Sequence, residues 1–149
     1  FGEFGASLAM KVQDKKTAGS IKGVDYKAEL TLWDLLINAN EKGLLECANS
    51  VGVGGAALSV AKMVALSCVG VDLKSEFKNE AWLFEESASR AVVGVKDEEA
   101  FLNLTQKFGI KAFKLGLSTK KQEFIFDEIC LSCEELKKLY FESFKEQML

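Results

Sequence analysis

The segment that begins at Ser50 constrains the fold more than any other part of the chain. A glycine-rich turn runs to Gly55, and the apolar stretch from Ala56 to Cys68 after it predicts a helix. This stretch is apolar almost all round, and its small alanine side chains allow close packing. Because such a helix has little polar surface for water, we expect it to lie against a β-sheet. Strand candidates on both sides of it, at 44–48 and 69–73, fit this expectation.

The rest of the chain alternates helices and short strands. The helix over 25–42 carries a second apolar strip, Leu30, Trp33 and Ile37, so we expect it to be buried on much of its circumference. Further helices are expected at 5–13 and 79–85, from the N-cap Asp97 to Gly109, and after the capping pair Ser132 and Glu135. Residues 15–23 are expected to form a loop. Further strands are expected at 90–95, 110–117 and 123–126, and a polar turn at 118–121 is expected to join the last two. This mixed order predicts one layered α+β domain over 1–149, with a mixed sheet and packed helices.

Composition and charge exclude several functions. The chain contains no histidine, which excludes imidazole acid–base chemistry and His-ligated metal within it. Its 19 basic and 22 acidic residues form no basic stripe, so we expect no nucleic-acid binding. No apolar run reaches the roughly 18 residues of a membrane span, and no signal peptide is present, so we expect a cytoplasmic protein without a membrane partner.

The four cysteines do not form a convincing site. Cys130 and Cys133 make a C-x-x-C, but Cys47 and Cys68 are not spaced as the second pair that a zinc ribbon needs. No Trp or Pro context supports a redox motif. We therefore expect structural or incidental thiols, and no metal bound by this chain.

The glycine turn is the first candidate binding site. Backbone N–H groups at a helix N-terminus attract anions, and Gly54 and Gly55 would let a phosphate approach the backbone. The turn is neither a Walker loop nor a dinucleotide-binding fingerprint, because the required residues do not follow it. The alternative is a tight turn that packs a helix onto a sheet.

The second candidate is the polar segment before the strand at 90–95. It contains Glu86, Ser87, Ser89 and Arg90, and Arg90 is the only arginine in the chain. A guanidinium among hydroxyl groups suits a phosphate or carboxylate ligand. The alternative is a charged loop with a capping serine and a surface ion pair.

These segments resemble a known family. Leu83 to Val93 is similar to the motif Leu-Phe-(Gly/Ser)-Glu-Ser-x-Ser-Arg-x-Val-Val, Asn49 to Ala61 looks like a His-Asp…Gly-Gly-Leu-Ala-Val-Ala segment, and Phe4 to Ser7 looks like a glycine-serine entry. All three belong to C-terminal domains of the aminoimidazole-ribonucleotide-synthase-related superfamily, and within it to the phosphoribosylformylglycinamidine synthase family. The resemblance covers essentially the whole chain, in order.

The resemblance implies an ATP-dependent C–N ligase of purine synthesis. Such an enzyme converts formylglycinamide ribonucleotide, Mg²⁺-ATP and glutamine-derived ammonia to the amidine, through phosphoryl activation of the amide oxygen. It implies two tandem pairs of N- and C-domains, a separate glutaminase subunit and a small accessory subunit. Because the chain starts at Phe1 and not at methionine, we expect a C-terminal fragment of this longer enzyme, inactive alone.

Three positions depart from the family pattern. Asn49 stands where the family has histidine, Ser50 where it has aspartate, and Lys62 where it has an acid. Magnesium prefers carboxylate and water oxygens, so this copy has lost acids of a metal or phosphate site. The resemblance therefore implies a degenerate half with a structural or regulatory role, in which Gly54, Gly55, Glu86, Ser87, Ser89 and Arg90 remain the best candidates for substrate or phosphate binding.

Two other hypotheses remain open. One is a purely structural or interaction domain without any ligand. The other is a different superfamily member, such as selenophosphate synthetase, thiamine-phosphate kinase or a hydrogenase maturation protein, although the Glu86-Ser87-x-Ser89-Arg90 segment argues against these.

Overall fold

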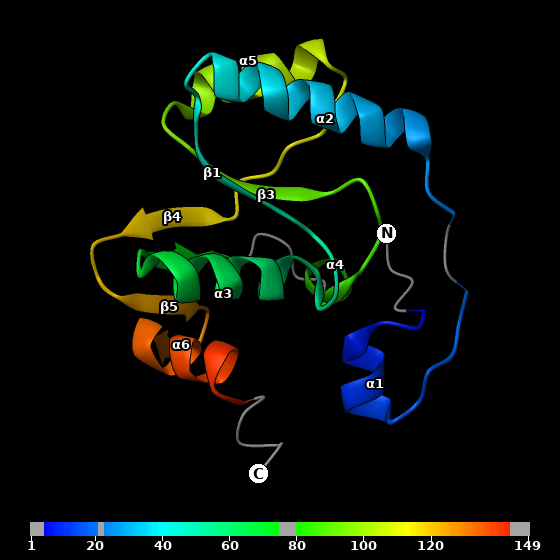
Figure 1. Ribbon diagram of the computed structural model, residues 1–149, viewed down its shortest axis with the longest axis vertical. Coiled ribbons are helices and arrows are strands. Elements are labelled where there is room, and N and C mark those ends of the chain that lie inside the picture. The colour runs from blue at the N-terminus through cyan, green and yellow to red at the C-terminus, as the bar shows by residue number, and fades with distance from the viewer. Residues whose placement is uncertain (1–4, 21–22, 75–79, 144–149) are drawn as a thin grey trace.

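The structure is a computed structural model that describes residues 5–20, 23–74 and 80–143 (Figure 1). Within these residues the chain forms six helices and six strands. They are α1 (Leu8–Asp14), α2 (Tyr26–Glu41), β1 (Leu45–Ser50), α3 (Gly55–Ser67), β2 (Gly70–Leu73), α4 (Glu80–Phe84), β3 (Ala91–Val95), α5 (Glu98–Lys107), β4 (Gly116–Thr119), β5 (Glu123–Phe126), β6 (Ile129–Ser132) and α6 (Cys133–Phe141). The expected residues Phe4, Asn79 and Phe144 lie outside the described part.

The strands form two sheets. β1 and β3 make an antiparallel ribbon, in which Ala48 lies opposite Val93. The other described strands form a sheet in the order β4-β2-β5-β6, where β2 runs parallel to β5 and antiparallel to β4. The predicted α+β class, with a mixed sheet and packed helices, is confirmed.

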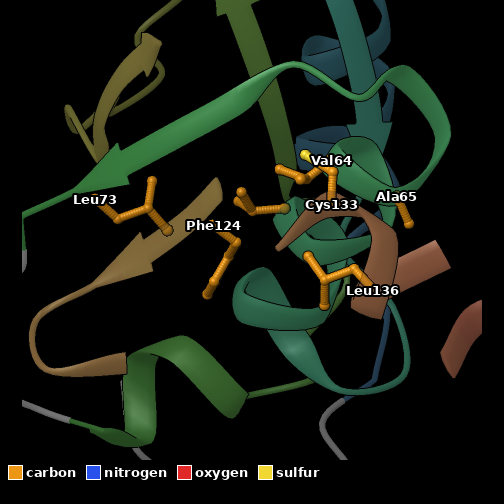
Figure 2. Packing of buried hydrophobic residues seen from close by; sticks show 7 residues of the cluster. Val64, Ala65, Leu73, Phe124, Cys133 and Leu136 are labelled. Atoms are coloured by element: carbon orange, nitrogen blue, oxygen red, sulfur yellow. The ribbon is translucent and has the colours of Figure 1, made fainter. Parts of the chain in front are cut away.

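Two hydrophobic clusters lie on either side of the ribbon. On one side α3 packs on the four-stranded sheet and α6, and Figure 2 shows Val64, Phe124 and Leu136 converging there. On the other side Leu35 of α2 meets Leu104 of α5, together with half-buried side chains of the ribbon (Figure 1). The prediction that the apolar helix lies against a sheet is therefore confirmed.

Local capping signals are also confirmed. Asp97 caps α5 and Ser132 forms a complete capping box with Glu135, both as predicted, and Asp25, which was not predicted as a cap, caps α2. Gly109 follows α5 with a φ of +66°, a left-handed conformation that glycine adopts readily. No helix among the described residues is long and apolar enough to span a bilayer.

Two expectations about burial are wrong. Leu30, Trp33 and Ile37 of α2 are 57%, 54% and 55% exposed, because α5 and the ribbon cover only the opposite face of this helix. The valine-rich sequence at 90–95 predicts a buried strand, but β3 is only half-buried along its length, since its ribbon has just two strands.

The strand predictions after residue 110 need correction. Only 116–119 pairs as β4, and Ser118 and Thr119 belong to the strand and not to the turn. β4 and β5 are not neighbours, because β2 lies between them. β6 was not predicted; it pairs with β5 through a turn at Asp127, which has a φ of +50°.

Candidate functional site

The two predicted binding segments meet where β1 ends and β3 begins. Ser50 lies opposite Ala91 in the ribbon, and the N–H of Val51 donates to the carbonyl of Arg90 at 3.0 Å. The glycine turn and the polar loop before β3 are thereby held side by side. The sequence singled out these segments separately, and the antiparallel pairing of β1 with β3 unites them.

Glu86 makes the central contact of this region. Its Oε1 accepts a hydrogen bond from the N–H of Gly54 at 2.8 Å. The same oxygen accepts another from the N–H of Leu8 at 2.7 Å. A carboxylate belonging to the chain thus occupies the start of α3, where the sequence suggested an external anion.

The glycines at this turn are required by a left-handed backbone and, at Gly55, by close backbone packing. Gly54 and Gly55 have φ values of +82° and +69°. A Cβ on Gly55 would lie 2.2 Å from the carbonyl oxygen of Leu83, so α3 starts against the end of α4. This geometry is that of a tight turn that packs a helix, which was the alternative interpretation of the segment.

Arg90 is held by carbonyl oxygens near the end of α4. Its Nη1 donates to Glu85 and its Nη2 to Trp82, each at 2.9 Å. Its guanidinium also lies 5.0 Å from the centre of the Trp82 ring, a cation–π distance. Burial lowers the pKa of Arg90, and the nearby Glu85 charge acts in the opposite direction. Arg90 remains charged, and it binds the helix end instead of standing free in a loop.

Glu85 is buried beside this arginine. Its side chain is 6% exposed, and its Oε2 has no hydrogen-bond partner within the described residues. The family motif has glycine or serine at this position, so Glu85 is a further departure from the family pattern. No local pattern marks its burial, which follows from the packing of the loop.

Ser89 connects the loop to α2. Its Oγ donates to Oε2 of Glu29 at 2.7 Å, and Trp33 Nε1 donates to the other oxygen of that carboxylate at 2.9 Å. Ser87 is half-buried in the same loop. The role of Glu29 was not predicted, because 60 residues separate it from Ser89 and nothing in the sequence links them.

Two of the three departing positions tie β1 to α3. Asn49 Nδ2 donates to the carbonyl of Ser59 at 3.3 Å, and Ser59 Oγ donates to the carbonyl of Ser50 at 3.1 Å. Ser59 is buried, whereas Lys62, one turn further along α3, is half-buried.

The region does not fit a magnesium ion. Nowhere in the described residues do three carboxylate or thiol side chains gather closely enough to hold a metal. The amide of Asn49 faces a carbonyl, and an ammonium group at position 62 would repel a cation.

The four cysteines differ in how exposed their thiols are. All four are free thiols, with Cys130 exposed on β6 and Cys133 buried at the start of α6. Burial raises the pKa of the Cys133 thiol, and the nearby Cys68 adds to this effect. The C-x-x-C thus sits at a strand-to-helix junction with one thiol outside and one in the core.

The fold and the place where the glycine turn meets the polar loop define a class of domain. It is an α+β domain in which a glycine turn and a Glu-Ser-x-Ser-Arg loop meet at the start of a buried helix. The family described as "AIR synthase related protein, C-terminal domain" matches residues 2–128. The chain belongs to this family.

Relatives within the family are much longer than this chain. Phosphoribosylformylglycinamidine synthase subunit PurL of Campylobacter jejuni is 61% identical over 149 residues, which cover 99% of this chain and 20% of that protein. The PurL subunit of Campylobacter lari is 45% identical over 147 residues, with the same two shares. The chain spans about a fifth of the length of these relatives.

Solved structures share the fold. Thermotoga maritima PurL complexed with FGAR matches with a TM-score of 0.68 and 23% identity, covering 85% of this chain and 23% of that one. The same protein complexed with AMPPCP matches with a TM-score of 0.64 and 22% identity, covering 80% and 24%. At these identities the likeness establishes the fold alone.

Proposed function

We propose that this domain belongs to an ATP-dependent phosphoribosylformylglycinamidine synthase. In the proposed reaction, ATP phosphorylates the amide oxygen of formylglycinamide ribonucleotide, ammonia attacks the activated carbon, and phosphate leaves to give the amidine. The observation that carries the proposal is the 61% identity to a Campylobacter synthase subunit over nearly the whole chain. ATP and Mg²⁺ would be required by the complete enzyme, in the cytoplasm, rather than bound by this domain.

Within that enzyme we assign residues 1–149 to a single C-terminal domain with a structural role. The internal partners of the predicted ligand residues support this assignment. Gly54 N–H is taken by Glu86, both Nη atoms of Arg90 bind carbonyls, and Ser89 binds Glu29. In our proposal this set positions α3, α4 and α2 around the end of the ribbon, and substrate binds elsewhere in the longer polypeptide.

The exposed face of α2 supports packing against preceding domains of the same polypeptide. Tyr26, Leu30, Trp33 and Ile37 are each more than half exposed and recur along one side of the helix. Contiguous apolar patches of this kind mark interaction sites in soluble proteins. A separate glutaminase subunit and a small accessory subunit would complete the assembly and supply ammonia.

The reaction is tested with the longer polypeptide that carries this domain. Formylglycinamide ribonucleotide, Mg²⁺-ATP and ammonium salt should yield amidine and ADP, both quantified by chromatography. Failure of the folded polypeptide to form the amidine would overturn the proposed reaction.

The structural role is tested on the 149-residue chain. Its far-ultraviolet circular dichroism should show a folded protein that neither turns over nor binds Mg²⁺-ATP or the ribonucleotide in calorimetry. Saturable binding that disappears in Arg90→Ala, but persists in the control Lys62→Ala, would instead establish a ligand site at this junction.

A further inference from the structure

Residues 5–20 form a closed loop at the N-terminal side of the domain, which we term the N-terminal strap. The N–H of Ala6 donates to the carbonyl of Ala18 at 2.8 Å, so the two ends of the loop meet. Gly5 and Gly19 lie against each other there, since a Cβ on Gly19 would lie 2.6 Å from the Cα of Gly5. The helix α1 lies between these ends (Figure 1).

Apolar packing contributes little to holding the strap. α1 contains no buried residue, and Val12 is 71% exposed. Ser7 is buried, but its Oγ accepts from the N–H of Met10, which belongs to the strap itself. Among the described residues, α1 therefore removes little apolar surface from water beyond the half-buried Ala9 and Met10, which gives polar contacts a large share in the attachment.

That polar contact is the carboxylate of Glu86. Its Oε1 lies 2.7 Å from the N–H of Leu8, the first residue of α1, and 2.8 Å from the N–H of Gly54, the N-cap of α3. Hydrogen bonds to an ionised group are about twice as strong as those between neutral groups. One oxygen thus joins the strap to α3 across 78 residues of sequence on one side and 32 on the other.

We propose that Glu86 is a latch that holds the N-terminal strap against the start of α3. While the latch is closed, the N–H of Gly54 is occupied and cannot meet another anion. Loss of the carboxylate leaves the N–H groups of Leu8 and Gly54 without this partner, and the strap detaches while the rest of the domain stays folded. This inference goes beyond the proposed function and does not depend on the reaction.

Hydrogen exchange of single amides, followed by NMR on the full 149-residue chain, tests the latch. Glu86 is the partner of both the Leu8 and Gly54 amides, so their protection reports on the contact directly. In Glu86→Ala both should exchange about 10- to 100-fold faster than in the unmodified chain. The amide of Leu104 in the α5 core should be unaffected, and Glu86→Gln, which retains one acceptor, should fall between.

Proteolysis and a matched glutamate complete the experiment. Trypsin should cut faster at the exposed Lys11 and Lys15 in Glu86→Ala. The control Glu46→Gln removes an exposed carboxylate paired with Lys96 and should change neither readout. Unchanged exchange at Leu8 in Glu86→Ala would overturn the latch. Equal acceleration at Leu8 and Leu104 would overturn it as well, because release would then be global unfolding.

Discussion

Gly55 is a residue whose replacement the structure tolerates poorly. It combines a left-handed backbone with direct contact between two chain segments, because its Cα faces the carbonyl oxygen of Leu83. Gly109 shares the left-handed backbone, with a φ of +66°, but nothing lies within 4 Å of the space that its Cβ would fill. Comparing substitutions at the two glycines therefore separates the cost of backbone strain from the cost of a steric clash.

Gly55→Ala should lower the free energy of unfolding by about 2–5 kcal/mol, since strain and overpacking add. Gly109→Ala should lower it by about 1–2 kcal/mol, from strain alone. Urea denaturation of both variants beside the unmodified chain measures the difference. Equal losses would show that the contact between α3 and α4 relaxes without cost.

At the scale of elements, α6 begins with a pair of reciprocal hydrogen bonds. Ser132 Oγ accepts from the N–H of Glu135 at 3.1 Å, and Glu135 Oε2 accepts from the N–H of Ser132 at 2.8 Å. These bonds favour the ionised carboxylate and lower the pKa of Glu135 below its ordinary value. Because this pKa is lower in the folded state than in the unfolded chain, the contribution to stability is present in full above the unfolded value, about 4.3.

Glu135→Gln should therefore destabilise the chain at pH 7, and the difference from the unmodified chain should shrink as the pH falls through the lowered pKa. Thermal unfolding of both proteins between pH 7 and pH 3 measures this. Glu134→Gln is the control, since Glu134 lies in the same turn without a bond to Ser132. A difference that stayed constant over this pH range would contradict the role of the ionised cap.

At the scale of the whole molecule, the ribbon separates two layers that differ in how completely they are covered. The layer of α3, α6 and the four-stranded sheet encloses the larger buried cluster, which includes Val64, Phe124 and Leu136. The layer of α2 and α5 is covered on one side and leaves the outer face of α2 exposed. Two leucines on opposite faces of α2 show this difference, because Leu35 is 2% exposed and Leu30 is 57% exposed.

Leu35→Ala should cost about 2–5 kcal/mol of unfolding free energy in the 149-residue chain, by removing buried methyl groups and leaving a cavity. Leu30→Ala, the same change on the same helix, should stay within about 0.5 kcal/mol. Guanidinium denaturation monitored by fluorescence distinguishes them. A comparable loss in Leu30→Ala would mean that the outer face of α2 is covered in the chain by itself.

Most parts of this fold that depend on neighbouring residues were predictable from the sequence, although the local hairpin of β5 and β6 was missed, and the parts that depend on distant partners were not predictable. Asp97 and Ser132 predicted where their helices begin, because a cap and its hydrogen-bond partners lie within one turn of sequence. The position of β2 between β4 and β5 had no such signal, since alternating hydrophobicity identifies a strand but not the strands with which it pairs. For the same reason both halves of the candidate site were recognised, while the bond from Ser89 to Glu29 was not.

The central place of β2 in its sheet also determines when that sheet can form. Both neighbours of β2 come from residues 116–126, far along the chain from 70–73. Closing such long loops costs entropy before any strand pairing is gained, which slows folding. During synthesis the segment that becomes β2 must therefore wait, without a strand beside it, until most of the chain has left the ribosome.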